Sequence, residues 1–482
     1  MSFNKKLAQD TINYGLGQAL PKVISFLLIP LYLVYLDPAE FGLIDLIVTT
    51  SAFLLTSMRL SLPGAISRFY FDFKTPQSIS TYISTIYFGV IGVSLVTGLI
   101  FLLIFLLFGE GLLPGISLYP FFTIILVTSF LNCSSDIQRR LLQVRRQSAY
   151  NAVLNTVNTL IGVLLTILFV VVYDMGVLGV VLSTLITTVI FFVQAQFYLQ
   201  KDITFSFDTS HFTDSLKFSL PLFLYHFLGS FAPVMSKSLL AGQISMAALG
   251  IFAIAYKFTQ PITIFSNALA SAYTPLYYAM RMEGDANPSI EQVKSSFNKI
   301  WTITLILFLA IFIFSKPILS LIPNTVYMEA DTCLKILAFG SLPAIFYQII
   351  SHEIFFQKKT KIALLMNVFA IVLMMVLSVI LVTPLKEIGI ALSMVVPGLL
   401  NAFLAYYFSN KYHEVVLDWH YFFKSLGVII LVACLVWTFN DYTSNYQLLY
   451  LVTVYCFSVG LILYLEKSLV VSFLNLIKLK WK

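Results

Sequence analysis

Charged side chains inside long apolar stretches are the residues whose chemistry stands out in this sequence. The lysines of this kind are Lys22, Lys237 and Lys257, and the same surroundings hold the carboxylate Asp45 and the imidazole of His226. A charge within hydrocarbon is costly, so each one is a functional hypothesis by default. Because the set is mainly cationic, and because lysine binds phosphate as a point charge, it predicts a cavity for an anionic, phosphate-bearing ligand.

Helical spacing gathers these charges onto polar faces. One face carries Asp45, Thr49, Ala52, Thr56 and Arg59, which recur at every third or fourth position. A second joins Gly15, Gln18, Lys22 and Ser25, and a third joins His226, Gly229, Pro233 and Lys237. The predicted ligands of the substrate are therefore Lys22, Arg59, Lys237 and Lys257, with Arg68 at the inner mouth. Asp45 and His226 are predicted to act in ion coupling or charge pairing.

Each of these residues also has a plainer interpretation. Lysines such as Lys22 and Lys237 can extend their ammonium groups to the membrane surface. Arg59 and Arg68 can be ordinary basic residues at the cytoplasmic end of a span. His226 can be a hydrogen-bonded core histidine, and Asp45 can pair with a lysine and hold helices together.

Composition places the chain in a membrane. Of its 482 residues 59% are hydrophobic and 11% are charged, whereas soluble proteins have roughly 25% charged residues. The apolar runs are about twenty residues long, the length that an α-helix needs to cross a bilayer. We therefore expect an all-α integral membrane protein. The four cysteines lie far apart, so neither a disulfide nor a metal site is predicted.

About fourteen spans are expected, and their basic residues indicate the orientation. Lys and Arg concentrate in every second loop, for example Arg139–Arg146, which by the positive-inside rule places both termini in the cytoplasm. The net charge of +7 then needs only this topology and anionic lipid, and no nucleic acid. The expected spans are Thr11–Leu36, Phe41–Leu60, Tyr82–Phe108, Leu118–Ile137, Ala149–Tyr173, Val177–Tyr198, Leu216–Leu240, Ala247–Ala270, Ile300–Ser320, Leu334–Phe356, Lys361–Thr383, Ile388–Ser409, Phe422–Asn440 and Leu448–Glu466.

The first six spans resemble the next six. AEFGLIDL (Ala39–Leu46) matches AALGIFAI (Ala247–Ile254) at an offset of 208 positions, and LGVVLS (Leu178–Ser183) matches IGIALS (Ile388–Ser393) at 210. An even number of spans per repeat gives a parallel repeat around an axis along the membrane normal. The sequence thus predicts six-helix bundles at 1–205 and 206–412 that form a V-shaped central cavity. Residues 413–482 add two transmembrane helices and a basic cytoplasmic tail.

The second span contains an EFG segment, and an RFY segment (Arg68–Tyr70) lies at the inner end of that span. On these two segments and its two six-span repeats, the chain resembles the polysaccharide-transporter flippases. These belong to the multidrug/oligosaccharidyl-lipid/polysaccharide exporter superfamily. The resemblance implies a flippase of the cytoplasmic (inner) membrane that moves undecaprenyl-pyrophosphate-linked oligosaccharide from the inner to the outer leaflet, as in O-antigen, lipopolysaccharide or capsule assembly. It also implies that Lys22, Arg59, Lys237 and Lys257 meet the pyrophosphate.

Two other functions compete with the flippase. A cation-coupled multidrug exporter of the same superfamily would use acidic cavity residues, of which Asp45 is the clearest. A polytopic enzyme of glycan assembly would need catalytic groups in large outer loops, and these loops are short. No phosphate-binding loop of the GxxxxGK[ST] type occurs, so we expect a transporter without cofactors. Its expected partners are the lipid-linked oligosaccharide, anionic lipid, H⁺ or Na⁺ as coupling ion, and the polymerase and glycosyltransferases of the same pathway.

Overall fold

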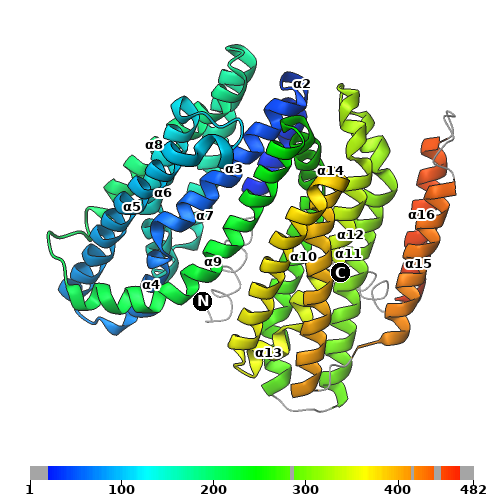
Figure 1. Ribbon diagram of the computed structural model, residues 1–482. Coiled ribbons are helices and arrows are strands. Elements are labelled where there is room, and N and C mark those ends of the chain that lie inside the picture. Colours follow the sequence, from blue (N-terminus) through cyan, green and yellow to red (C-terminus); the bar gives the residue numbers. More distant parts are fainter. Residues whose placement is uncertain (1–19, 283–286, 414–416, 439–446, 467–482) are drawn as a thin grey trace, which may run out of the picture. The chain divides into compact units, whose positions relative to one another are not determined.

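The computed structural model describes residues 20–282, 287–413, 417–438 and 447–466, and these contain helices but no strand. The helices are α2 (Ile29–Tyr35), α3 (Pro38–Arg59), α4 (Leu62–Phe69), α5 (Pro76–Leu112), α6 (Thr123–Val144), α7 (Ser148–Ile167), α8 (Gly176–Leu199), α9 (Thr209–Gln243), α10 (Met246–Met282), α11 (Asn287–Ser320), α12 (Ala330–Ile350), α13 (His352–Phe356), α14 (Thr360–Tyr412), α15 (Trp419–Thr438) and α16 (Gln447–Leu465) (Figure 1). Short 3₁₀ or π turns are η1 (Tyr70–Asp72), η2 (Leu118–Phe122), η3 (Leu168–Val172) and η4 (Thr325–Glu329).

The expected all-α membrane fold is confirmed. Twelve helices of the described part are long and apolar enough to span a membrane, and the shorter apolar helix Leu20–Tyr35 lies within the expected first span. One of the twelve, α14, contains two expected spans, because Lys386 breaks its helical geometry with φ 50° and ψ −129°. Residues 11–19 of the first span and the basic tail 467–482 lie outside the described residues.

The chain divides into two compact units, and α10 and α14 run through both. One unit contains Met1–Ala253 and Ser378–Lys386, and the other contains Ile254–Leu377 and Glu387–Lys482. This division follows packing, whereas the boundaries at 205 and 412 follow the predicted repeat, which stays a prediction.

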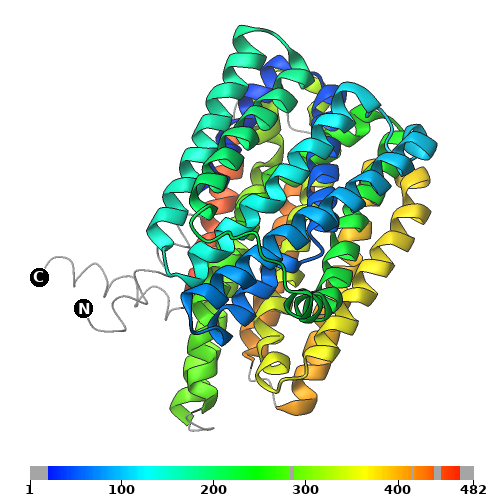
Figure 2. The same ribbon diagram turned by 90° about the vertical axis from the view of Figure 1, so that its left-hand side faces the viewer.

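The first unit is arranged around α6. This helix packs against α3, α4, α5 and α8, and α9 packs against α3, α4 and α5. These helices, coloured blue to green, form one group in Figure 1, and Figure 2 shows the same group from another side. The core contains Met58, Ile83, Ile137, Leu141 and Leu199, all at most 2% exposed. The packing fixes the faces that α3 and α9 present to each other.

Local signals set where these two helices begin. Asp37 and Glu40 form a reciprocal capping box at the start of α3, with the Glu40 N–H donating to Asp37 Oδ1 at 2.7 Å. Pro38 occupies the first turn of α3, where its missing N–H costs nothing. Asp208 caps α9 by accepting from the backbone N–H groups of His211 and Ser210, and these bonds hold the pKa of its carboxyl below the ordinary value.

Helix α3 and the start of α10 cross at a pair of glycines. A Cβ added to Gly42 would lie 2.3 Å from the carbonyl oxygen of Met246, and one added to Gly250 would lie 1.8 Å from that of Pro38. Both distances are far below contact, so only glycine allows the backbones to approach so closely. The contact is reciprocal at the offset of the predicted repeat, because 250 − 42 and 246 − 38 both equal 208. Such a contact is what a two-fold axis between repeats would produce.

Candidate functional site

The polar face predicted on α3 exists, and its two charged ends contact different helices. Asp45 lies about two turns from the start of α3, and Arg59 is the last residue of the helix. Between them Thr49 donates to the carbonyl oxygen of Asp45 at 2.7 Å, and Thr56 donates to that of Ala52 at 2.9 Å. These threonines satisfy their own hydroxyl donors within the helix and keep their oxygens available as acceptors.

Near the start of α3, this face forms a buried ion pair with α9. Lys237 Nζ lies 2.6 Å from Asp45 Oδ2, and the two side chains are 7% and 5% exposed. The same ammonium donates to Thr49 Oγ1 at 2.6 Å. Lys237 therefore contacts two consecutive turns of α3, and α9 is joined to α3 by charge as well as by apolar packing.

Forming such a buried ion pair contributes little net stability, whereas removing one of its partners costs much. Removing two charges from water is expensive, and their attraction offsets that cost only when the remaining donors and acceptors are satisfied. Breaking the pair at one partner leaves a buried, uncompensated charge at a cost of about 3–5 kcal/mol. The pair consequently holds α3 and α9 in one register as long as both groups keep their charge.

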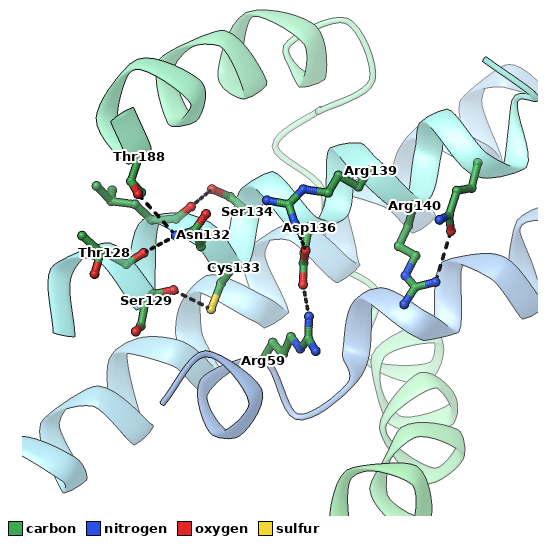
Figure 3. Close-up of polar contacts among 12 residues, drawn as sticks. Arg59, Thr128, Ser129, Asn132, Cys133, Ser134, Asp136, Arg139, Arg140 and Thr188 are labelled. Carbon is green, nitrogen blue, oxygen red and sulfur yellow. Dashed lines mark hydrogen bonds and ion pairs between the residues drawn. The ribbon is translucent and has the colours of Figure 1, made fainter. Parts of the chain in front are cut away.

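The opposite end of α3 belongs to an arginine cluster, which we define as Arg59, Arg139 and Arg140 with the carboxylate of Asp136. Figure 3 shows Asp136 between Arg59 and Arg139; Arg59 is its ion-pair partner from α3, and Arg139 lies 3.1 Å away on α6. Arg140 donates to the amide oxygen of Gln143 at 3.1 Å and meets no carboxylate among the described residues. Three guanidinium groups and one carboxylate leave a net charge of +2, which favours an anionic ligand.

His226 belongs to the same region. It is exposed on α9, and it lies close enough to Arg59 and Arg140 for their charges to act on its ring. Its predicted role in coupling or charge pairing stays a prediction. The proximity adds a residue of α9 to the surroundings of the arginine cluster.

The other predicted ligands lie apart from these contacts. Lys22 is exposed and forms no ion pair within the part of the chain that the structure describes. Arg68 is 56% exposed, lies 3.1 Å from Asp72 and stacks its guanidinium over Phe69. Lys257 is half-buried on α10 and belongs to the other compact unit. The structure thus joins Lys237 with Asp45, whereas Lys22 does not take that carboxylate.

Sequence reasoning missed a second buried charged network, in the unit that contains Lys257. Glu353 is 1% exposed; Arg281 Nε lies 3.1 Å and the Tyr277 hydroxyl 2.5 Å from its Oε2. Beside it, His352 Nε2 lies 2.6 Å from the Thr274 hydroxyl. His352 and Glu353 are adjacent in the sequence, which is a signal for this network, but they do not fit a metal-ligand spacing. In the described residues no group of three or more His, Cys, Asp or Glu side chains could hold a metal.

The sequence as a whole matches a known family. A family model described as "Polysaccharide biosynthesis protein" matches residues 7–281, more than half of the chain. The chain belongs to this family, and the predicted resemblance is confirmed. A second model, described as MatE, matches residues 221–380. No curated protein sequence matches the chain.

Solved structures show which fold this family member has. The lipid II flippase MurJ in an inward closed conformation matches with a TM-score of 0.74 at 15% identity, over 94% of this chain and 99% of that one. An inward-facing multidrug resistance MATE transporter of the MOP superfamily matches with a TM-score of 0.65 at 15% identity, over 82% and 97%. An outward-facing multidrug resistance MATE transporter of the MOP superfamily matches with a TM-score of 0.57 at 16% identity, over 84% and 95%. The chain therefore has the fold shared by these transporters.

Proposed function

We propose that this protein is a flippase for undecaprenyl-pyrophosphate-linked oligosaccharide, such as an O-antigen or capsule repeat unit. The observation that carries the proposal is the match to the polysaccharide biosynthesis family over residues 7–281, in a chain with the fold of a lipid II flippase. A lipid-linked sugar is the kind of intermediate that a membrane protein of glycan synthesis without large extramembrane domains would move. The protein would lie in the cytoplasmic membrane with both termini inside and would work beside glycosyltransferases and a polymerase.

The arginine cluster supports an anionic substrate. Arg140 has an amide as its partner, and Arg59 and Arg139 share one carboxylate. Guanidinium groups bind phosphate oxygens in a bidentate manner, so Arg59 and Arg140 are proposed contacts for the pyrophosphate. Lys22, Arg68 and Lys257 remain proposed ligands on the strength of the sequence.

The ion pair supports a structural role for Lys237 in this conformation. Its ammonium is already engaged by Asp45 and Thr49, so it would reach a pyrophosphate only when that pair breaks. Alternating access by rocking of helices would supply such a change, and the two prolines within α9, Pro221 and Pro233, would allow bending. Coupling to H⁺ or Na⁺ at Asp45 would likewise require the pair to open.

The first experiment removes, in cells, two lysines that are proposed to bind the substrate. Lys22→Ala and Lys257→Ala are each expected to abolish surface glycan display and to leave the amount of protein in the membrane normal, because each removes a proposed pyrophosphate contact. Display is measured with a glycan-specific antibody, and lipid-linked intermediate is quantified in membrane extracts. Lys316→Ala, which removes a lysine near the predicted outer end of the Ile300–Ser320 span, is the matched control. Wild-type glycan display in both variants would contradict the proposal that a cationic cavity binds the substrate.

A second candidate function is export of cationic drugs. The MatE match at residues 221–380 and the MATE structures favour it, and Asp45 would be the acidic group. Its pairing with Lys237 argues against this role, because a carboxylate neutralised by an ammonium attracts a cationic drug weakly. Deletion of the gene that sensitised cells to cationic drugs while glycan display stayed normal would favour the exporter.

A further inference from the structure

An apolar cavity of about 570 Å³ lies between α3, α5, η2 and α9 in the first unit. Its wall is rich in aromatic rings, and Phe53 of α3 is their centre. The ring centroid of Phe53 lies 5.5 Å from that of Phe101 on α5, and 5.3 Å and 5.6 Å from those of Phe227 and Phe231 on α9. Protein interiors are close-packed and rarely leave spaces larger than a water molecule. A cavity of this size and apolar lining, between helices that cross a membrane, is therefore suited to an apolar ligand.

Two hydroxyl groups interrupt the apolar wall. Thr50, which is 1% exposed, and Ser238 both line the cavity. Their buried oxygens, Thr50 Oγ1 and Ser238 Oγ, have no hydrogen-bond partner among the described residues. A buried hydroxyl without a partner is unfavourable, and a rotation of either side chain would turn its oxygen toward a polar atom of an occupant.

The position of these hydroxyls adds a second constraint. Thr50 follows Thr49 in sequence, and Ser238 follows Lys237, so the two hydroxyls lie at the same level of α3 and α9 as the buried ion pair but on a different face of each helix. The far wall includes the end of α5, where Gly111 leaves open space at the rim. An occupant would be a long apolar chain with an oxygen beside it.

We propose that this cavity binds the hydrocarbon chain of a lipid, with Thr50 and Ser238 hydrogen-bonded to an oxygen at the head of that chain. A polyprenyl phosphate and a bilayer phospholipid share this chemistry. If the polyprenyl lipid is the occupant, the site deepens the proposed flippase function by giving the substrate's tail a place separate from the arginine cluster.

The test uses photo-crosslinking of the purified full-length protein in nanodiscs. One sample contains a polyprenyl phosphate with a diazirine near its phosphate, and another contains phosphatidylcholine with a diazirine-labelled acyl chain. Labelled peptides are identified by mass spectrometry. We expect labelling to concentrate on the cavity wall, in the peptides that contain Phe101 and Phe231.

Two variants of α5 make the test specific. An added Cβ at Gly111 meets nothing within 4 Å, so Gly111→Phe is expected to fill the rim without distorting the helix and to lower labelling of the wall at least fivefold. Gly92 is also open on α5 but does not line the cavity, so Gly92→Phe is the matched control and should label as wild type. Thr50→Val keeps the shape, removes the hydroxyl, and is expected to lower labelling about fivefold, the equivalent of about 1 kcal/mol for one hydrogen bond.

The outcomes distinguish the two possible sources of the bound hydrocarbon chain, polyprenyl lipid and bilayer phospholipid. Labelling by the polyprenyl probe alone identifies the lipid-linked substrate class, and labelling by the acyl probe identifies bilayer lipid; both support a hydrocarbon-chain site. Labelling spread evenly over the lipid-facing helices, and unchanged in Gly111→Phe, would overturn the proposal. Because binding is measured without transport, the result does not depend on whether the protein is a flippase.

Discussion

At the scale of single residues, the role of a buried charged side chain depends on the group with which it pairs. Lys237 and Asp45 were both predicted from their surroundings, one as a ligand and one as a coupling or pairing group, and the structure pairs them at 2.6 Å. Helical periodicity predicted the face of α3, since Asp45 and Thr49 contact the same ammonium. It could not predict the partner, because a contact between helices so distant in sequence depends on tertiary packing.

The ion pair leads to a prediction about stability. Lys237→Met or Asp45→Asn alone is expected to lower the free energy of unfolding by about 3–5 kcal/mol, because each leaves a buried group unpaired. The double variant should lose much less than the two single losses together. The midpoint of thermal unfolding in detergent, compared across all four proteins, measures this coupling. Losses that simply add would show that the two groups do not depend on each other.

At the scale of elements, close approach of backbones governs how helices cross. The sequence predicted this span from Phe41, whereas α3 begins at Pro38 behind the capping box of Asp37 and Glu40; Gly42 lies in the segment that matched Ala247–Ile254 in the predicted repeat. Nothing in the local pattern states that Gly42 and Gly250 touch, because glycine is also common in membrane helices that make no such contact. The break at Lys386 was expected as an outer loop between two spans, and the structure makes it a sharp turn within a continuous run.

The crossing can be tested with a small substitution. Gly250→Ala is expected to lower the unfolding midpoint strongly, since the new Cβ would lie 1.8 Å from the Pro38 carbonyl oxygen and the helices would have to separate. Overpacking of this kind costs about 1–3 kcal/mol. Gly92→Ala, where the Cβ meets nothing within 4 Å, should be neutral or stabilising. Equal midpoints for the two variants, measured by size exclusion after heating, would contradict the crossing.

At the scale of the whole molecule, composition and periodicity predicted the fold well. Length and hydropathy alone distinguish membrane helices, because each helix must satisfy its own backbone hydrogen bonds in lipid. The functional site was harder to predict from the sequence than the fold. The buried network around Glu353 depends on Arg281, which falls between the expected spans Ala247–Ala270 and Ile300–Ser320, yet Arg281 Nε lies 3.1 Å from the carboxylate.

Orientation is a prediction that belongs to this scale. An alkaline phosphatase fusion after Asp174 is expected to be active, because that loop has no Lys or Arg and should face outward. A fusion after Lys201 should be inactive, while a green fluorescent protein fusion there should fluoresce. The opposite pair of results would reverse the topology and place both termini outside.

The reciprocal glycine contact has a consequence for the origin of the ion pair. A contact in which Gly42 faces Met246 and Gly250 faces Pro38 is self-complementary, so a single-length ancestor would have used the same surface to pair with its own copy as a homodimer. The positions equivalent to Asp45 and Lys237 at the same offset of 208 are Ala253 and Ile29. If the predicted repeat arose by gene duplication, the glycine contact would keep its symmetry and the ion pair would not, so the ion pair would be a feature that only the fused chain encodes.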